Sequence, residues 1–126
     1  MTRILVAEDE RDIRDLIAFT LQFANFEVVL AANGEQAVEE ALRSKPDLIL
    51  MDVRMPKMTG YEACRIIKES PIGAEVPVVF LSAKGQESEI SEGLEAGGID
   101  YILKPFAPED LIAQVKHILN THETDR

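Results

Sequence analysis

Carboxylates that directly follow two short apolar runs are the residues of this sequence best suited to chemistry. Glu8 and Asp9 follow the run Ile4–Ala7, and Asp52 follows the run Leu48–Met51. If the two runs are neighbouring parallel strands about 5 Å apart, these three carboxylates share one small space. Carboxylates so close raise one another's pKa unless a cation neutralises them. All-oxygen ligands favour Mg²⁺, and no histidine or cysteine lies nearby in the sequence to indicate zinc.

A hydroxyl and a cation follow two later apolar runs. Ser82 follows the run Val76–Leu81, and Lys104 follows the run Tyr101–Leu103. A metal ion and a lysine can neutralise the oxygens of a phosphoryl group while a carboxylate such as Asp52 attacks in line. The set of side chains therefore predicts transfer of a phosphoryl group to a carboxylate.

Each of these residues also has a plain structural explanation. Glu8 and Asp9 could begin a loop and favour the amino end of the next helix. Asp52 could be a turn or cap residue, Ser82 a turn former and Lys104 a solvated surface charge. Nothing structural, however, requires acids at the ends of two adjacent strands, so the set as a whole favours a site.

The elements that would position these side chains begin with five short runs rich in Val, Ile and Leu. Continuous apolar strands of this kind belong to a parallel sheet that is covered on both faces. The expected strands are Ile4–Ala7, Phe26–Leu30, Leu48–Met51, Val76–Leu81 and Tyr101–Leu103.

Amphipathic segments with the period of helices separate these runs. The expected inward stripe of the first segment comprises Ile13, Leu16, Ile17, Thr20 and Leu21. The later helices are expected to begin near Asn33, Thr59, Ser88 and Pro108, of which the first is a good N-cap and the last suits a first turn.

Five strand–helix units with right-handed crossovers predict an α/β fold, a doubly wound (βα)5 sandwich of the flavodoxin-like kind. The expected strand order is 2-1-3-4-5, and sites in such sheets form at the carboxyl ends of the strands beside the topological switch. We expect one domain over residues 1–121 and a polar tail over residues 122–126.

The charge balance limits the partners of the chain. Its 126 residues carry a formal net charge of −10, which disfavours direct binding to nucleic acid or to anionic membranes. The single cysteine, Cys64, excludes an intrachain disulfide, is expected to be a buried thiol and suits the reducing cytoplasm. No apolar segment approaches the ~18 residues that a membrane span requires.

Four motifs together resemble the receiver domain of two-component response regulators. They read "ILVAEDE", "LILMDVRMPKMTG", "VVFLSA" and "DYILKPF", and they cover nearly the whole chain in the expected order. The resemblance implies a signalling switch, not a metabolic enzyme, that catalyses only its own phosphorylation and dephosphorylation. It implies a histidine kinase or phosphotransfer protein as the donor, and a downstream protein or fused output domain as the target.

The resemblance also implies roles for individual residues. Asp52 would accept the phosphoryl group, while Ser82 and Lys104 would each contact one of its oxygens. Tyr101 would be the switch aromatic, turning inward when Ser82 moves towards the phosphoryl group. The implied Mg²⁺ ligands are Glu8, Asp9, Asp52 and the backbone carbonyl of Arg54.

Further implied features concern the lifetime of the phosphorylated state and its output. Ala83 would lie beside the phosphoryl group, and Arg54 and Lys84 occupy positions that tune phosphate lifetime. Output would pass through the surface of the fourth helix, the fifth strand and the fifth helix. A homodimer that forms on phosphorylation is a further alternative. The last helix lacks the basic run that supports one well-known dimer across the fourth helix, fifth strand and fifth helix, which argues against that mode.

Two other functions remain as alternatives. A phosphohydrolase with an aspartate nucleophile normally needs a second acid placed as general acid, but the residue two positions after Asp52 is Arg54. A flavodoxin-like cofactor binder would need a phosphate-cradling loop after the first strand, where "AEDERD" would instead repel phosphate.

Overall fold

Strands and helices alternate along the chain. The computed structural model describes residues 1–82 and 87–124, with side chains described for residues 1–82 and 91–121. The elements in chain order are β1 Arg3–Ala7, α1 Arg11–Phe23, β2 Glu27–Ala31, α2 Gly34–Ser44, β3 Leu48–Asp52, α3 Gly60–Glu69, β4 Val78–Ser82, α4 Glu87–Glu95, β5 Asp100–Leu103 and α5 Pro108–Thr124.

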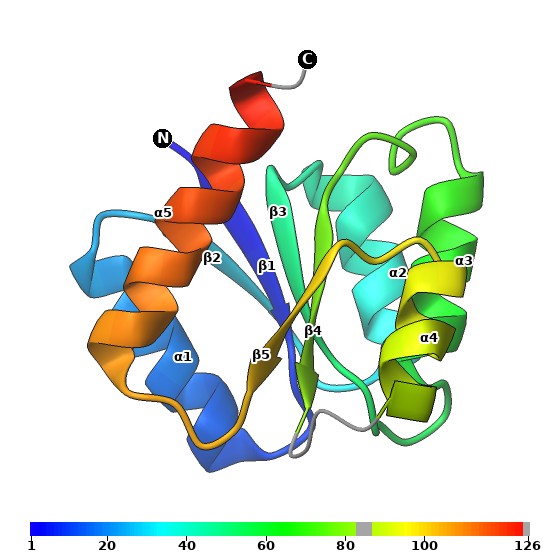
Figure 1. Cartoon of the computed structure of the whole chain (residues 1–126), viewed down its shortest axis with the longest axis horizontal. Coiled ribbons are helices and arrows are strands. Elements are labelled where there is room, and N and C mark those ends of the chain that lie inside the picture. Colours follow the sequence, from blue (N-terminus) through cyan, green and yellow to red (C-terminus); the bar gives the residue numbers. More distant parts are fainter. Residues whose placement is uncertain (83–86, 125–126) are drawn as a thin grey trace.

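The strands form one parallel sheet in the order β2-β1-β3-β4-β5, which confirms the predicted fold class and strand order. Helices α1 and α5 cover one face of the sheet, and α2, α3 and α4 cover the other (Figure 1). The strand arrowheads point to the bottom of this view, whereas the amino terminus and the last turns of α5 lie at the top. All carboxyl ends of the strands therefore meet at one edge.

Side chains alternate between the two faces and make two cores. In β1, Leu5 and Ala7 belong to the core under α2, α3 and α4, whereas Ile4 and Val6 belong to the core under α1 and α5. The residues of β3 and β4 are buried on both faces. This burial explains why these strands are apolar up to their last residue and why the sheet has a rigid centre.

Small differences in strand bounds matter at the carboxyl edge. β3 and β4 each run one residue further than predicted, so Asp52 and Ser82 are the last residues of their strands. β4 starts at Val78 because Pro77 has no N–H to join the ladder. α5 continues to Thr124, into the segment that we expected to be a tail.

One predicted burial is wrong. Leu16 is 48% exposed, whereas Ile17 and Leu21 are fully buried. The core-facing stripe of α1 is rotated towards Ala18, which is buried. Ala18 was not among the residues predicted to face inward. The buried thiol of Cys64 is confirmed; its Sγ donates a hydrogen bond to the carbonyl oxygen of Ala96 at 3.3 Å.

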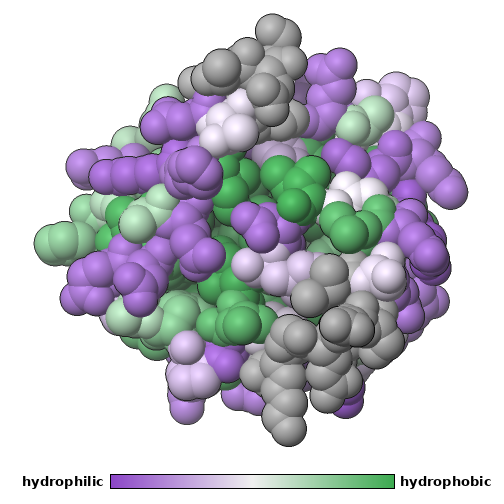
Figure 2. Space-filling view, viewed as in Figure 1, coloured by the Kyte–Doolittle hydropathy of each residue, from purple (hydrophilic) through white to green (hydrophobic). Residues whose placement is uncertain are grey.

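One face of the molecule combines apolar and hydrophilic side chains (Figure 2). Figure 2 shows hydrophobic residues gathered around the middle of the face that carries β5, with hydrophilic residues around them. Among the described side chains of α4, β5 and the segment between them, the exposed large apolar residues are Leu94, Ile99 and Leu103. No helix among the described residues is long and apolar enough to span a bilayer.

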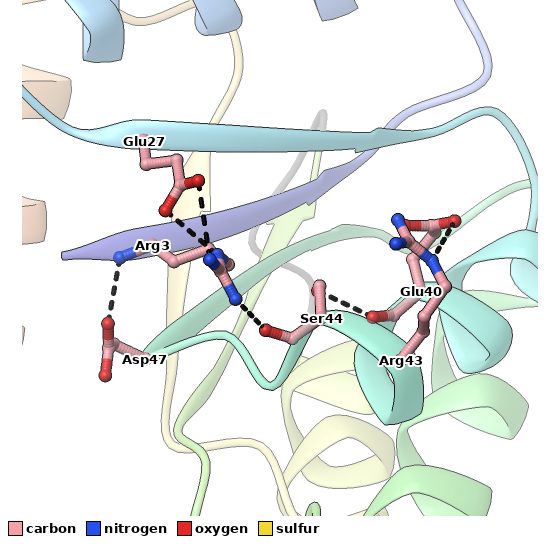
Figure 3. A network of polar contacts seen from close by, with 6 residues as sticks. All are labelled: Arg3, Glu27, Glu40, Arg43, Ser44 and Asp47. Carbon is pink, nitrogen blue, oxygen red and sulfur yellow. Dashed lines mark hydrogen bonds and ion pairs between the residues drawn. The ribbon is translucent and has the colours of Figure 1, made fainter. Parts of the chain in front are cut away.

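Arg3 joins several elements at the amino ends of the strands (Figure 3). Its Nε donates to Glu27 on β2 at 2.9 Å, and its Nη1 donates to the carbonyl oxygen of Ser44, the last residue of α2. A cation at this end of a helix satisfies a carbonyl that has no partner within the helix. The backbone N–H of Arg3 donates to Asp47 at 2.8 Å, which links β1 to the start of β3.

We expect Arg3→Met to lower the free energy of unfolding by about 1–2 kcal/mol, because a carbonyl hydrogen bond and a half-exposed ion pair are lost. Urea denaturation followed by circular dichroism measures this change. Arg43→Met is the matched control, since Arg43 pairs with Glu40 on the exposed side of α2 and its loss should lower the free energy of unfolding much less than the loss of Arg3. Equal effects of the two substitutions would contradict the role given to Arg3.

Candidate functional site

Three carboxylates converge where β1 and β3 end. Ligand oxygens of Glu8, Asp9 and Asp52 all lie within 4.8 Å of one another. Glu8 is fully buried and Asp52 is 7% exposed, while Asp9 faces solvent. Among these three acids, Asp9 therefore gives the cluster its contact with solvent.

The sheet register produces this convergence. β1 and β3 are adjacent, with Ala7 opposite Met51, so the residues that follow each of them meet at the edge. The backbone N–H of Glu8 donates to the carbonyl oxygen of Ala31 at 3.0 Å, which continues the ladder with β2 by one residue and holds Glu8 in place.

Lys104 brings its ammonium into the same space from the end of β5. Its Nζ lies 2.9 Å from Oε1 of Glu8 and 3.3 Å from Oδ1 of Asp52. Burial lowers the pKa of the Lys104 ammonium, but the hydrogen bond to Glu8 and the charge of Asp52 outweigh that effect and the pKa lies above its ordinary value. Lys104 therefore stays charged at neutral pH and bridges the two buried acids.

Asp52 has the strongest electrostatic perturbation at this edge. Burial raises the pKa of its carboxyl to about 7, and the hydrogen bond and negative charge of Glu8 add to the rise, while the charge of Lys104 opposes it. A carboxyl with this pKa changes its ionisation near neutral pH, so the arrival of a cation beside it would ionise it fully.

The donor set fits a hard divalent cation. Three carboxylates face one lysine, so when all are ionised the cluster carries two negative charges in excess. Carboxylate oxygens, a solvent-facing side and this excess charge are what Mg²⁺ requires. The residues present therefore fit Mg²⁺, as the sequence led us to expect.

The loop after β3 packs tightly on the backbone of Asp52. A Cβ added to Gly60 would lie 2.2 Å from the carbonyl oxygen of Asp52, so only glycine fits there. The N–H of Gly60 also donates to the carbonyl oxygen of Val53 at 2.9 Å. A capping box between Thr59 and Glu62 then starts α3. Asp52 thus has a rigid support behind it.

The remaining predicted site residues are placed as follows. Ser82 is buried at the end of β4, with its neighbour Leu103 on β5 one residue before Lys104. Arg54 is exposed in the loop after β3. Tyr101 is half-buried on β5, and its ring lies 5.5 Å from that of Phe80. Ala83 and Lys84 both lie outside the described residues.

Two contributors to the site were missed in the sequence. Nη1 of Arg14 donates to the carbonyl oxygen of Glu8 at 2.9 Å and so braces the acidic loop from α1. Its charge within the first turns of a helix was the only available signal. The hydroxyl of Tyr61 lies 3.0 Å from that of Tyr101, a contact across 40 residues that no sequence pattern indicates.

Comparisons with known proteins agree with the observed fold. A model of the response regulator receiver domain matches residues 4–116. The phosphate regulon transcriptional regulatory protein PhoB of Pseudomonas aeruginosa is 41% identical over 116 residues, 92% of this chain and 51% of that protein. Transcriptional regulatory protein ResD of Bacillus subtilis is 42% identical over 118 residues, 94% of this chain and 48% of that protein. The chain therefore spans about half the length of these curated relatives.

Solved structures resemble the chain along nearly its whole length. Chemotaxis protein CheY4 of Vibrio cholerae matches with a TM-score of 0.90 and 32% identity, over 93% of this chain and 98% of that one. The receiver domain of sensor histidine kinase PA1611 of Pseudomonas aeruginosa matches with a TM-score of 0.84 and 36% identity, over 95% of each chain. That structure holds a magnesium ion coordinated in its active-site cleft.

Proposed function

Because this chain belongs to the response regulator receiver domain family, we propose that Asp52 is the carboxylate on which it accepts a phosphoryl group. Members of the family are phosphorylation-dependent signalling proteins and not metabolic enzymes. The observation that carries the assignment is the placement of Asp52. It is held at a strand end beside two further acids, with the Lys104 ammonium 3.3 Å away.

In the proposed reaction, a carboxylate oxygen of Asp52 attacks the phosphorus atom of a phosphohistidine on the donor. The P–N bond breaks, the imidazole leaves and takes a proton from solvent, and an acyl phosphate remains on Asp52. The Lys104 ammonium pairs with one phosphoryl oxygen and the Ser82 hydroxyl donates to another, which offsets the charge that develops during transfer. Hydrolysis of the acyl phosphate by water returns the carboxylate.

The metal site of this proposal uses the acidic cluster. Asp9, Asp52 and the backbone carbonyl of Arg54 would hold Mg²⁺, with Glu8 contributing through water. Bound there, Mg²⁺ supplies positive charge to the phosphoryl oxygens. Asp52 must attack as a carboxylate, and its pKa of about 7 means that positive charge beside it favours the reactive form.

The partners in this proposal follow from the family. The donor is a histidine kinase or phosphotransfer protein in the cytoplasm. Phosphorylation shifts the surface of α4, β5 and α5, which acts on an output domain of the same protein, on a separate protein or on a second copy. With a net charge of −10 this domain itself repels nucleic acid. Population shift suffices for such a signal, because contacts to the phosphoryl group favour one arrangement of these elements.

Incubation with Mg²⁺ and acetyl phosphate, followed by intact-mass measurement, tests the proposal. We expect the mass to rise by one phosphoryl group in the parent chain and not in Asp52→Asn or in excess EDTA. Asp47→Asn is the matched control, because Asp47 is an exposed aspartate at the opposite end of β3. An adduct that persists in Asp52→Asn would overturn the assignment.

Arg54 and Lys84 carry a separate expectation about phosphate lifetime. Two long cations near the phosphoryl group would restrict attacking water, so we expect Arg54→Ala and Lys84→Ala to speed dephosphorylation by about 2- to 5-fold, the effect of one solvent-exposed ionic contact. Release of inorganic phosphate from the purified phosphoprotein gives the rate. Arg65→Ala, at an exposed position on α3, should leave it unchanged. Dephosphorylation of both variants at the parent rate would contradict a role for Arg54 and Lys84 in phosphate lifetime.

A further inference from the structure

Three aromatic rings connect α3, β4 and β5 on one side of the sheet. The rings of Tyr61 and Phe80 meet edge to face, with centroids 4.9 Å apart, and Phe80 lies 5.5 Å from Tyr101. The hydroxyls of Tyr61 and Tyr101 then meet at 3.0 Å. Phe80 and Tyr101 are also opposite each other in the register of β4 and β5. The two tyrosines therefore hold each other through both a hydrogen bond and a shared neighbour.

α4 leaves room for Tyr101 at one position. A Cβ added to Gly93 would lie 2.2 Å from the hydroxyl oxygen of Tyr101 and 2.9 Å from its Cζ. A glycine inside a helix costs stability relative to alanine. Here it makes the space that the Tyr101 hydroxyl occupies. We call this space the tyrosine seat, formed by Tyr61, Phe80 and Gly93.

Both tyrosines are tied to the surroundings of Asp52. Tyr61 directly follows Gly60, which packs on the carbonyl of Asp52. Phe80 lies two residues before Ser82 on β4, so these two side chains point to the same face of the sheet. A displacement of Asp52 can therefore reach the tyrosine pair through Gly60, and a displacement of Ser82 can reach it through Phe80.

We propose that Tyr61 is a positioning residue of the switch, whose hydroxyl holds Tyr101 in the tyrosine seat that the phosphorylated state favours. This inference rests on the proposed function. The pair is already formed in the structure, so it biases the chain towards the responsive arrangement before any donor arrives. By linkage, loss of the pair must weaken binding of a phosphoryl mimic to Asp52, although Tyr61 does not touch the site.

The chain contains its own reporter for this pair. It has two tyrosines and no tryptophan, so both tyrosine signals of the protein arise from the seat. Incorporation of 3-fluorotyrosine gives one ¹⁹F resonance for Tyr61 and one for Tyr101. In Tyr61→Phe, Tyr101 is the one labelled residue that remains, so its resonance is assigned directly.

The experiment titrates the labelled chain with beryllofluoride in saturating Mg²⁺. In Tyr61→Phe we expect the Tyr101 resonance to be displaced before ligand is added, and beryllofluoride affinity to fall about two- to tenfold, as the loss of one hydrogen bond implies. Mg²⁺ affinity should not change. An unmoved resonance, or parent-like beryllofluoride affinity with or without a lower Tm, would overturn the proposal and leave the tyrosine pair purely structural.

Gly93→Ala gives an independent arm. The added methyl group should expel the Tyr101 hydroxyl from the seat and weaken beryllofluoride binding, even though alanine favours the helix. Ser91→Ala, at an exposed position of α4, is the matched control and should change neither signal. Failure of the proposed function is distinct, because then the parent chain itself would bind no beryllofluoride.

Discussion

Lys104→Met should slow phosphoryl acceptance from acetyl phosphate by about 10²- to 10³-fold at saturating Mg²⁺, the usual cost of one preorganised electrostatic contact to the reacting group. The expectation rests on the position of its ammonium, 3.3 Å from the Asp52 carboxylate and held there by Glu8 at 2.9 Å. Methionine has a similar length and flexibility but no charge. Stopped-flow or quenched mass measurements give the rate.

The controls separate charge at this site from charge in general. Lys116→Met removes a lysine from the exposed side of α5 and should leave the rate unchanged. Lys104→Arg keeps a positive charge but replaces a compact ammonium by a planar fork, so we expect it to recover only part of the rate. Acceptance by Lys104→Met at the parent rate would remove Lys104 from the mechanism.

Asp52→Asn should stabilise the metal-free fold at pH 8 by about 2–4 kcal/mol, because the folded state raises the pKa of Asp52 from 3.8 to about 7. Between these values the folded carboxyl binds a proton that the unfolded chain has lost. Stability of the parent chain therefore falls as pH rises from about 4 to about 7 and is level above that range. Asparagine carries no such penalty, so the difference between the two proteins should vanish near pH 4.

Denaturant unfolding in EDTA at pH 5 and pH 8 measures this difference. Addition of Mg²⁺ at pH 8 should reduce it, because a cation among Glu8, Asp9 and Asp52 relieves the repulsion in the parent chain. Asp15→Asn, at an exposed position of α1, serves as the control for loss of one negative charge elsewhere. An advantage of Asp52→Asn that is the same at both pH values would show that burial of Asp52 carries no electrostatic cost.

Much of the fold was predictable because β1, β3 and β4 are apolar apart from one terminal residue each, and such strands belong at the centre of a parallel sheet covered on both faces. The convergence of Glu8 and Asp52 followed from strand order alone, since neighbouring strands end side by side. Their pairing with Lys104 did not, because a contact across 96 residues depends on how three side chains share a buried space.

Other features escaped prediction for related reasons. The rotation of α1 that buries Ala18 and exposes Leu16 is set by how the helix packs on the sheet, and a pattern of apolar residues defines that stripe only to within one position. The Tyr61–Tyr101 contact depends on the space beside Gly93, which exists only once α4 has packed. The sequence pattern thus indicated which residues gather at the strand ends, whereas the contacts that hold the surrounding helices depend on side-chain packing.

Chemical mapping of the phosphorylated chain identifies directly whether Asp52 carries the phosphoryl group. Borohydride reduces an aspartyl phosphate to homoserine, so treatment of the phosphorylated chain followed by peptide mass spectrometry identifies the modified residue. We expect homoserine at position 52 and aspartate retained at positions 9 and 47. Homoserine at another position, or none after Mg²⁺-dependent phosphorylation, would contradict it.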